Sequence, residues 1–71
     1  ANMKVGSKGS QVVLLQRALN AAGFKLKGKV DGLFGPDTLQ ALERFQAIHA
    51  KPVDGITGPK TRAALDRVLN K

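Results

Sequence analysis

The chain contains the same short phrase twice, because VDGLFGPDT begins at Val30 and VDGITGPKT begins at Val53. Aligned at this offset of 23 positions (53 − 30), the copies agree through the turn and at later apolar positions. The matching pairs are Val30/Val53, Asp31/Asp54, Gly32/Gly55, Gly35/Gly58, Pro36/Pro59, Thr38/Thr61, Ala41/Ala64, Leu42/Leu65 and Arg44/Arg67. Such a repeat is typical of a duplicated turn that directs a helix toward a shared core. Two copies are too few for a solenoid, so we expect them to pack around a preceding helix.

Each copy begins with an Asp-Gly turn and continues into a Gly-Pro helix start. Aspartate accepts hydrogen bonds from backbone amides further along, and glycine tolerates positive φ. Proline suits the first helical position, where its missing N–H is not needed. Helices are therefore predicted from Pro36 to Ala50 and from Pro59 onward. Phe45 falls on the apolar stripe of the first of these and is predicted to be buried.

The segment GSQVVLLQRALNAAG has apolar residues at three- and four-residue spacing, which indicates another amphipathic helix. We predict this helix from Ser10 to Ala22, with Ser10 as its N-cap and Gly23 as the residue that ends it. Gln16 and Asn20 are expected on its outer side. The next stretch, FKLKGKV, alternates apolar residues with lysine, which predicts an extended segment too short for a sheet, with its lysines facing water.

These elements predict an all-α fold, a compact three-helix bundle with two repeated Asp-Gly turn–helix units. A chain of 71 residues has room for one domain and one core. Residues 1–4 are assigned to an N-terminal extension or a cloning remnant, and residues 5–71 to the domain. No apolar run approaches the roughly 20 residues of a membrane span, and no signal peptide is visible at the N-terminus.

Charge is the strongest compositional signal, because 12 Lys and Arg against 5 Asp and Glu give a net charge of +7. Such a surface attracts polyanions, including nucleic acid and acidic cell-wall polymers. A basic three-helix domain that binds nucleic acid is therefore the alternative function. Against it, no helix concentrates basic and amide side chains along one exposed stripe, as a recognition helix does.

The residues suited to catalysis are few. His49 is the only histidine and there is no cysteine. Asp31 and Asp54 could form an acid/base pair, but their place before glycine in identical turns favours a backbone-bonding role. No catalytic residue, metal site or cofactor is predicted.

Four motifs follow one another along the chain: V-x-x-L-Q-x-x-L-x-x-x-G, then D-G-x-F-G-x-x-T, then F-Q, then D-G-x-x-G-x-x-T. In this order they resemble the small three-helix peptidoglycan-binding domains of wall hydrolases and phage endolysins. The pattern is carried by Val12, Leu15, Gln16, Leu19, Gly23, Asp31, Gly32, Phe34, Gly35, Thr38, Phe45, Gln46, Asp54, Gly55, Gly58 and Thr61. It spans residues from about 5 to 69. One departure is Arg62, which stands where members of the family often have tryptophan.

The resemblance implies a non-catalytic, monomeric module that binds the glycan and stem peptide of peptidoglycan. The module would hold a covalently linked catalytic domain at the cell wall or in the periplasm, without binding nucleic acid or entering a membrane. It also implies a shallow groove beside the first Asp-Gly turn. The expected ligand-binding residues are Gln16, Asn20, Phe34, Thr38, Gln40, Lys25 and Lys27.

Phe34 and Thr57 occupy the same slot in the two copies. A slot that accepts threonine in one copy is not expected to require a buried ring in the other. Phe34 is therefore predicted to be a partly exposed ring beside the groove, and the alternative is that it plugs the core against the first helix.

Overall fold

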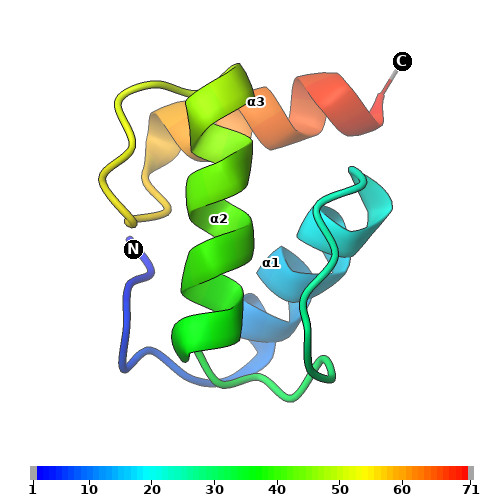
Figure 1. Ribbon diagram of the computed structural model, residues 1–71, viewed down its shortest axis with the longest axis vertical. Coiled ribbons are helices and arrows are strands. Elements are labelled where there is room, and N and C mark those ends of the chain that lie inside the picture. Colours follow the sequence, from blue (N-terminus) through cyan, green and yellow to red (C-terminus); the bar gives the residue numbers. More distant parts are fainter. Residues whose placement is uncertain (1, 71) are drawn as a thin grey trace.

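The computed structural model describes residues 2–70, and three helices form this part of the chain. Helix α1 spans Ser10–Ala21, α2 spans Pro36–His49 and α3 spans Pro59–Leu69. The helices cross at steep angles, and α3 lies across the C-terminal end of α2 (Figure 1). The prediction of a compact all-α domain with three helices is confirmed. None of the described helices combines the length and apolar character needed to cross a membrane.

The core lies where the three helices meet. Leu19 from α1 and Leu42 and Phe45 from α2 have no exposed surface, and Leu65 of α3 is 5% exposed. The remaining buried apolar residues are Met3, Val12, Leu15, Phe34, Ala41, Ala50 and Ala64. The predicted burial of Phe45 is confirmed, because the 3.6-residue period of α2 places this position on the same buried face as Ala41 and Leu42.

The start of α1 differs from the prediction. Gly9 occupies the N-cap position with φ of 114°, Ser10 is the first helical residue, and no side chain caps the helix. The backbone N–H of Gly9 donates to the carbonyl of Gly32 at 2.9 Å, so the helix start is held by the first turn. Ser10 as N-cap was therefore wrong, because the tertiary contact decides where the chain enters the helix.

The end of α1 follows the prediction more closely. Gly23 has φ of 95° and donates to the carbonyl of Asn20 at 3.1 Å, and Phe24 donates to the carbonyl of Leu19 at 2.9 Å. These are the two bonds of a Schellman motif, which satisfies the last carbonyls of a helix. The helix ends at Ala21, one residue before the predicted end.

The N-terminal segment pairs with both turns of the repeat. Met3 and Thr57 exchange backbone hydrogen bonds of 3.2 and 2.8 Å. Gly6 then donates to the carbonyl of Phe34 at 3.1 Å, and Phe34 donates to that of Ser7 at 2.9 Å. The segment thus connects the two copies of the repeat. Met3, which lies in the range assigned to an extension, is 9% exposed; the position of the domain boundary stays a prediction, and Ala1 lies outside the described residues.

Candidate functional site

The first Asp-Gly turn is built over the side-chain amide of Gln16, which is 1% exposed. Its Nε2 donates to Asp31 Oδ1 at 3.1 Å, to the Leu33 carbonyl at 3.1 Å and to Thr38 Oγ1 at 2.8 Å. Its Oε1 accepts from the N–H groups of Asp31 at 3.1 Å and Gly32 at 2.9 Å. A buried amide with both ends satisfied fixes the position of every group that it touches.

The second turn repeats this arrangement around Gln46, which is also 1% exposed. Its Nε2 donates to Asp54 Oδ1 at 2.8 Å, to the Ile56 carbonyl at 3.0 Å and to Thr61 Oγ1 at 3.2 Å. Its Oε1 accepts from the N–H of Gly55 at 3.0 Å. Gly32 and Gly55 both have positive φ, 76° and 70°, which explains the glycine in each turn.

The two turn aspartates are held in their ionised form. The pKa of Asp31 is lowered first by the backbone N–H of Leu33 and then by the Gln16 amide. The pKa of Asp54 is lowered in the same way by the N–H of Ile56 and then by the Gln46 amide. A general acid needs a pKa raised toward the working pH, so a lowered pKa does not suit that role. The backbone-bonding role predicted for both aspartates is confirmed.

Three of the residues expected to contact a ligand are buried. Gln16 and Thr38 are each 1% exposed and Phe34 is 3% exposed. The expectation that Gln16 faces outward was wrong, because its amide supports the turn. The partly exposed ring predicted at Phe34 was also wrong. Thr57 in the equivalent slot is buried as well, since the N-terminal segment pairs with both positions.

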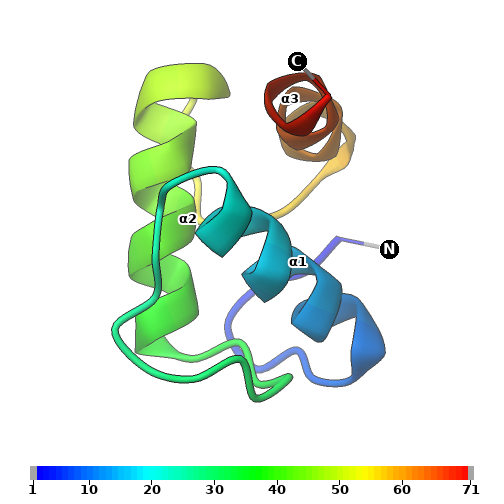
Figure 2. The ribbon, with the colours of Figure 1, turned by 90° about the vertical axis from the view of Figure 1, so that its right-hand side faces the viewer.

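The other expected residues lie near the connection between α1 and α2. Lys25, Lys27 and Gln40 are exposed. Asn20 is half-buried, and its Oδ1 accepts the backbone N–H of Leu26 at 2.9 Å, so it holds the connection in place. Figure 2 shows this connection passing beside α2. The lysines therefore project from a chain segment that the folded domain supports.

Hollows lie beside both turns and have equivalent linings, each with a volume of about 250 Å³. The shared positions are Asp31/Asp54, Leu33/Ile56, Gly35/Gly58, Pro36/Pro59, Asp37/Lys60 and Thr38/Thr61. The first hollow lies where the resemblance implies a groove. The repeat thus duplicates a surface shape but changes its charge, because Asp37 of one copy corresponds to Lys60 of the other.

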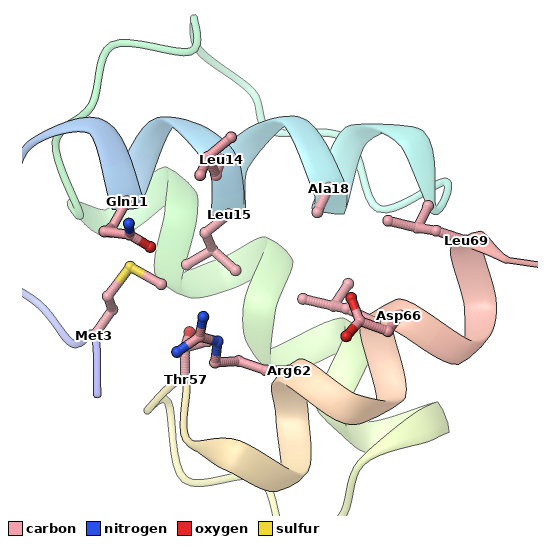
Figure 3. Close-up of a pocket in the computed structure, with 10 residues that line it drawn as sticks. Met3, Gln11, Leu14, Leu15, Ala18, Thr57, Arg62, Asp66 and Leu69 are labelled. Carbon is pink, nitrogen blue, oxygen red and sulfur yellow. The ribbon is translucent and has the colours of Figure 1, made fainter. Parts of the chain in front are cut away.

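A further groove lies between α1 and α3 (Figure 3). Its volume is about 150 Å³, and its lining is Met3, Gln11, Leu14, Leu15, Ala18, Thr57, Arg62, Leu65, Asp66 and Leu69. Leu14 and Leu69 are 57% and 40% exposed. Within residues 2–70, the hydroxyl of Thr57 has no hydrogen-bond partner although it is buried. Arg62 extends along the groove toward the end where Thr57 lies (Figure 3).

Sequence reasoning missed the groove and the half-buried ring of Phe24. This ring makes an edge contact with Phe45, with 5.5 Å between the ring centroids. It also borders a hollow of about 480 Å³ together with Gly23, Arg44, Ala47 and Ile48. One signal was present in the sequence: Leu14 and Ile48 are large apolar residues outside the main stripe of their helices, and Ile48 is 68% exposed.

The described residues offer little for catalysis or metal binding. Across residues 2–70, no three His, Cys, Asp or Glu side chains come together as metal ligands. His49 is exposed, and its ring packs against Phe45 with 5.1 Å between the centroids. The surface features that the described residues do form are the hollows beside the turns, the lysine-bearing connection and the α1–α3 groove.

Comparison with known families and structures gives concordant results. The family model described as "Putative peptidoglycan binding domain" matches residues 8–65. Comparison with curated protein sequences gives no significant match.

Several solved structures share the fold at appreciable sequence identity. The SleB N-terminal domain superposes with a TM-score of 0.91 at 40% identity, covering 97% of this chain and 93% of that one. The Burkholderia AP3 phage endolysin gives 0.83 at 40% identity, covering 92% of this chain and 24% of that one. A fused Zn-dependent amidase/peptidase/peptidoglycan-binding domain-containing protein from Clostridium acetobutylicum gives 0.83 at 35% identity, covering 93% of this chain and 29% of that one.

Proposed function

Because the chain belongs to the peptidoglycan-binding domain family, we propose that it is a non-catalytic module that holds a linked wall-degrading enzyme on peptidoglycan. The observation that carries this proposal is the family match over residues 8–65, which includes both turns and the whole of α1 and α2. The matched region covers 24% of the endolysin and 29% of the amidase-related protein, so in those relatives it is one part of a larger chain. Linkage to a catalytic domain is the corresponding arrangement proposed for this chain.

The absence of catalysis is supported by what the acidic residues do. Asp31 and Asp54 are hydrogen-bonded within their turns, with lowered pKa values. A pair of carboxylates that works as acid and base needs one group to remain protonated near the working pH. Binding without bond cleavage is therefore the activity that this geometry favours.

The proposed contact surface near the first turn consists of Lys25, Lys27, Gln40 and the outer side of Asn20. The lysines supply positive charge for the carboxylates of the wall, and the amides can bond sugar hydroxyls and peptide groups. Phe24 provides the partly exposed ring that Phe34 does not. In this proposal Gln16, Thr38 and Phe34 act indirectly, by holding the first turn in shape.

The test is co-sedimentation with purified sacculi across a salt series, with duplex DNA in parallel. Binding to sacculi that persists at high salt is the expected result. DNA binding alone, with a steep decline as salt rises, would overturn the proposal in favour of the nucleic-acid alternative. A turbidity assay with the same sacculi addresses catalysis, because lysis by this chain alone would contradict a non-catalytic role.

A further inference from the structure

The α1–α3 groove contains a polar group that the fold itself does not use. Thr57 is 1% exposed, and its hydroxyl has no partner within the described residues. Its backbone pairs with Met3, as the backbone of Phe34 pairs with Ser7 in the other copy. The same backbone slot therefore forms without any hydroxyl. A buried hydroxyl without a hydrogen bond is unfavourable. A ligand atom that accepts a hydrogen bond from it would remove that cost.

A second donor lines the same groove. The Arg62 side chain extends along the groove toward Thr57 (Figure 3). Arg62 is exposed on α3, so its long side chain is free to rotate toward a ligand that enters the groove. Arginine has only donors, and its planar group matches a carboxylate. Two donors that line the same end of the groove favour an anionic acceptor.

The rest of the lining indicates what the anion is attached to. Leu15, Ala18 and Leu65 provide apolar walls, and the Asp66 carboxylate lies further along the groove. A carboxylate in this position accepts from an amide or ammonium N–H. The order of groups along the groove is therefore cationic donor, apolar wall and acceptor, which matches the end of a peptide with small side chains and a free carboxylate.

The size and continuation of the groove favour the same occupant. Its volume of about 150 Å³ is small beside the roughly 300–1,000 Å³ of drug-sized ligand pockets. A neighbouring hollow of about 310 Å³ shares Met3, Gln11 and Arg62 with it and adds the cation Lys8. The end of the groove near Arg62 thus has two cations, Arg62 and Lys8. The small volume of the groove itself accommodates the end of a peptide better than a sugar ring.

We propose that the α1–α3 groove binds the carboxylate-bearing end of a peptidoglycan stem peptide, with Arg62 and Thr57 donating to the carboxylate. This inference rests on the proposed function and adds the part of the polymer that is recognised. The hollow beside the first turn and the lysine-bearing connection then remain available for the glycan on a different face of the domain.

The test is an NMR titration of the 15N-labelled chain with N-acetyl-D-Ala-D-Ala as the free acid, with the same peptide as its C-terminal amide, and with chitotetraose. The free acid is expected to shift the amide signals of Leu14, Thr57, Arg62 and Asp66. The C-terminal amide should bind at least tenfold more weakly. Equal binding of acid and amide, or shifts confined to the hollows beside the turns, would overturn the inference.

Variants separate this site from general electrostatics. Arg62→Gln should weaken binding of the free acid at least tenfold, and Thr57→Val about threefold. Arg67→Gln is the matched control, because it removes the same charge from an exposed position of α3 outside the groove. An equal loss in the control would contradict a specific carboxylate contact. Sacculus co-sedimentation distinguishes the two proposals: binding to sacculi without binding of the peptide refutes this inference alone, and failure of both refutes the proposed function as well.

Discussion

Gln16 and Gln46 hold equivalent positions beneath the two turns. Each amide donates to an aspartate, to a backbone carbonyl two residues after that aspartate and to a threonine hydroxyl, and each accepts from a glycine N–H. Gln16 precedes its aspartate by 15 residues and Gln46 precedes its aspartate by 8. The longer separation, between Gln16 and Asp31, contains the lysine-bearing connection. Both turns are therefore supported by a buried glutamine, but only the first turn is accompanied by the surface that these lysines form.

Gln16→Leu is expected to destabilise the domain by about 2–3 kcal/mol, because it leaves the buried Gly32 N–H without an acceptor and removes the donor to the Thr38 hydroxyl. Urea unfolding followed by circular dichroism measures the loss. Gln40→Leu is the control, since Gln40 is exposed on α2 and should change stability by less than about 0.5 kcal/mol. Equal stability of the two variants would contradict the supporting role of Gln16.

Stability should fall on the acid side. The pKa values of Asp31 and Asp54 are lowered in the folded chain, so folding favours their ionised forms. Their contribution is complete above the unfolded pKa of about 3.9 and is lost as the pH falls through the folded values. We therefore expect a melting temperature that is level between about pH 7 and pH 5 and falls below about pH 4.

The Asp31→Asn/Asp54→Asn double variant should show a shallower acid-side decline in thermal melts recorded across that pH range. Asp66→Asn serves as the control, because Asp66 is an exposed aspartate of α3 outside the turns. If the double variant loses stability as steeply as the unmodified chain, the turn aspartates are not the source of the decline.

Phe34→Ala is expected to unfold the domain or to destabilise it by about 3–5 kcal/mol, because the ring is 3% exposed. That loss is similar to the whole stability that one core supplies in a domain below about 70–80 residues. Phe34→Leu should preserve the fold at a cost below about 1.5 kcal/mol. Near-normal unfolding of Phe34→Ala together with weak sacculus binding would instead make the ring a direct contact.

Thr57→Val should raise stability by about 1 kcal/mol, because it removes a buried hydroxyl that has no partner within residues 2–70. For a domain of this size, that corresponds to roughly 4–8 °C in melting temperature. Thr61→Val is the opposite control, since the Thr61 hydroxyl accepts from Gln46 at 3.2 Å and its loss should destabilise. A lower melting temperature for Thr57→Val would mean that its hydroxyl has a partner in solution.

Replacing Lys25, Lys27 and Lys29 by glutamine should weaken sacculus binding mainly at low salt. These lysines are exposed and contribute long-range attraction, which salt screens over about 8–10 Å at 0.1–0.15 M. Binding isotherms at low salt and at about 0.5 M separate the two regimes. The matching lysine-to-arginine variant keeps the charge and should bind normally; an equally large loss at both salt concentrations would indicate close contacts.

The repeated phrase by itself determined the architecture. Asp-Gly and Gly-Pro are local signals, because turn geometry and helix starts depend on the φ that each residue prefers. Apolar spacing likewise identified Phe45 as core and Gly23 as the end of α1, since the helical period places side chains without reference to the rest of the chain. The fold class, the approximate helix bounds and the outward lysines therefore followed from residue order alone.

Tertiary structure alone decided which polar residues face inward. Gln16 is a polar residue that lies beside core positions of α1. Its burial is favourable only because the turn packed against the helix supplies hydrogen-bond partners for its amide. The burial of Phe34 and Thr57 depends on pairing with residues far away in sequence. The α1–α3 groove likewise arises between two helices that are far apart in the sequence. Such contacts are set by packing and shared hydrogen bonds, and no local pattern encodes them.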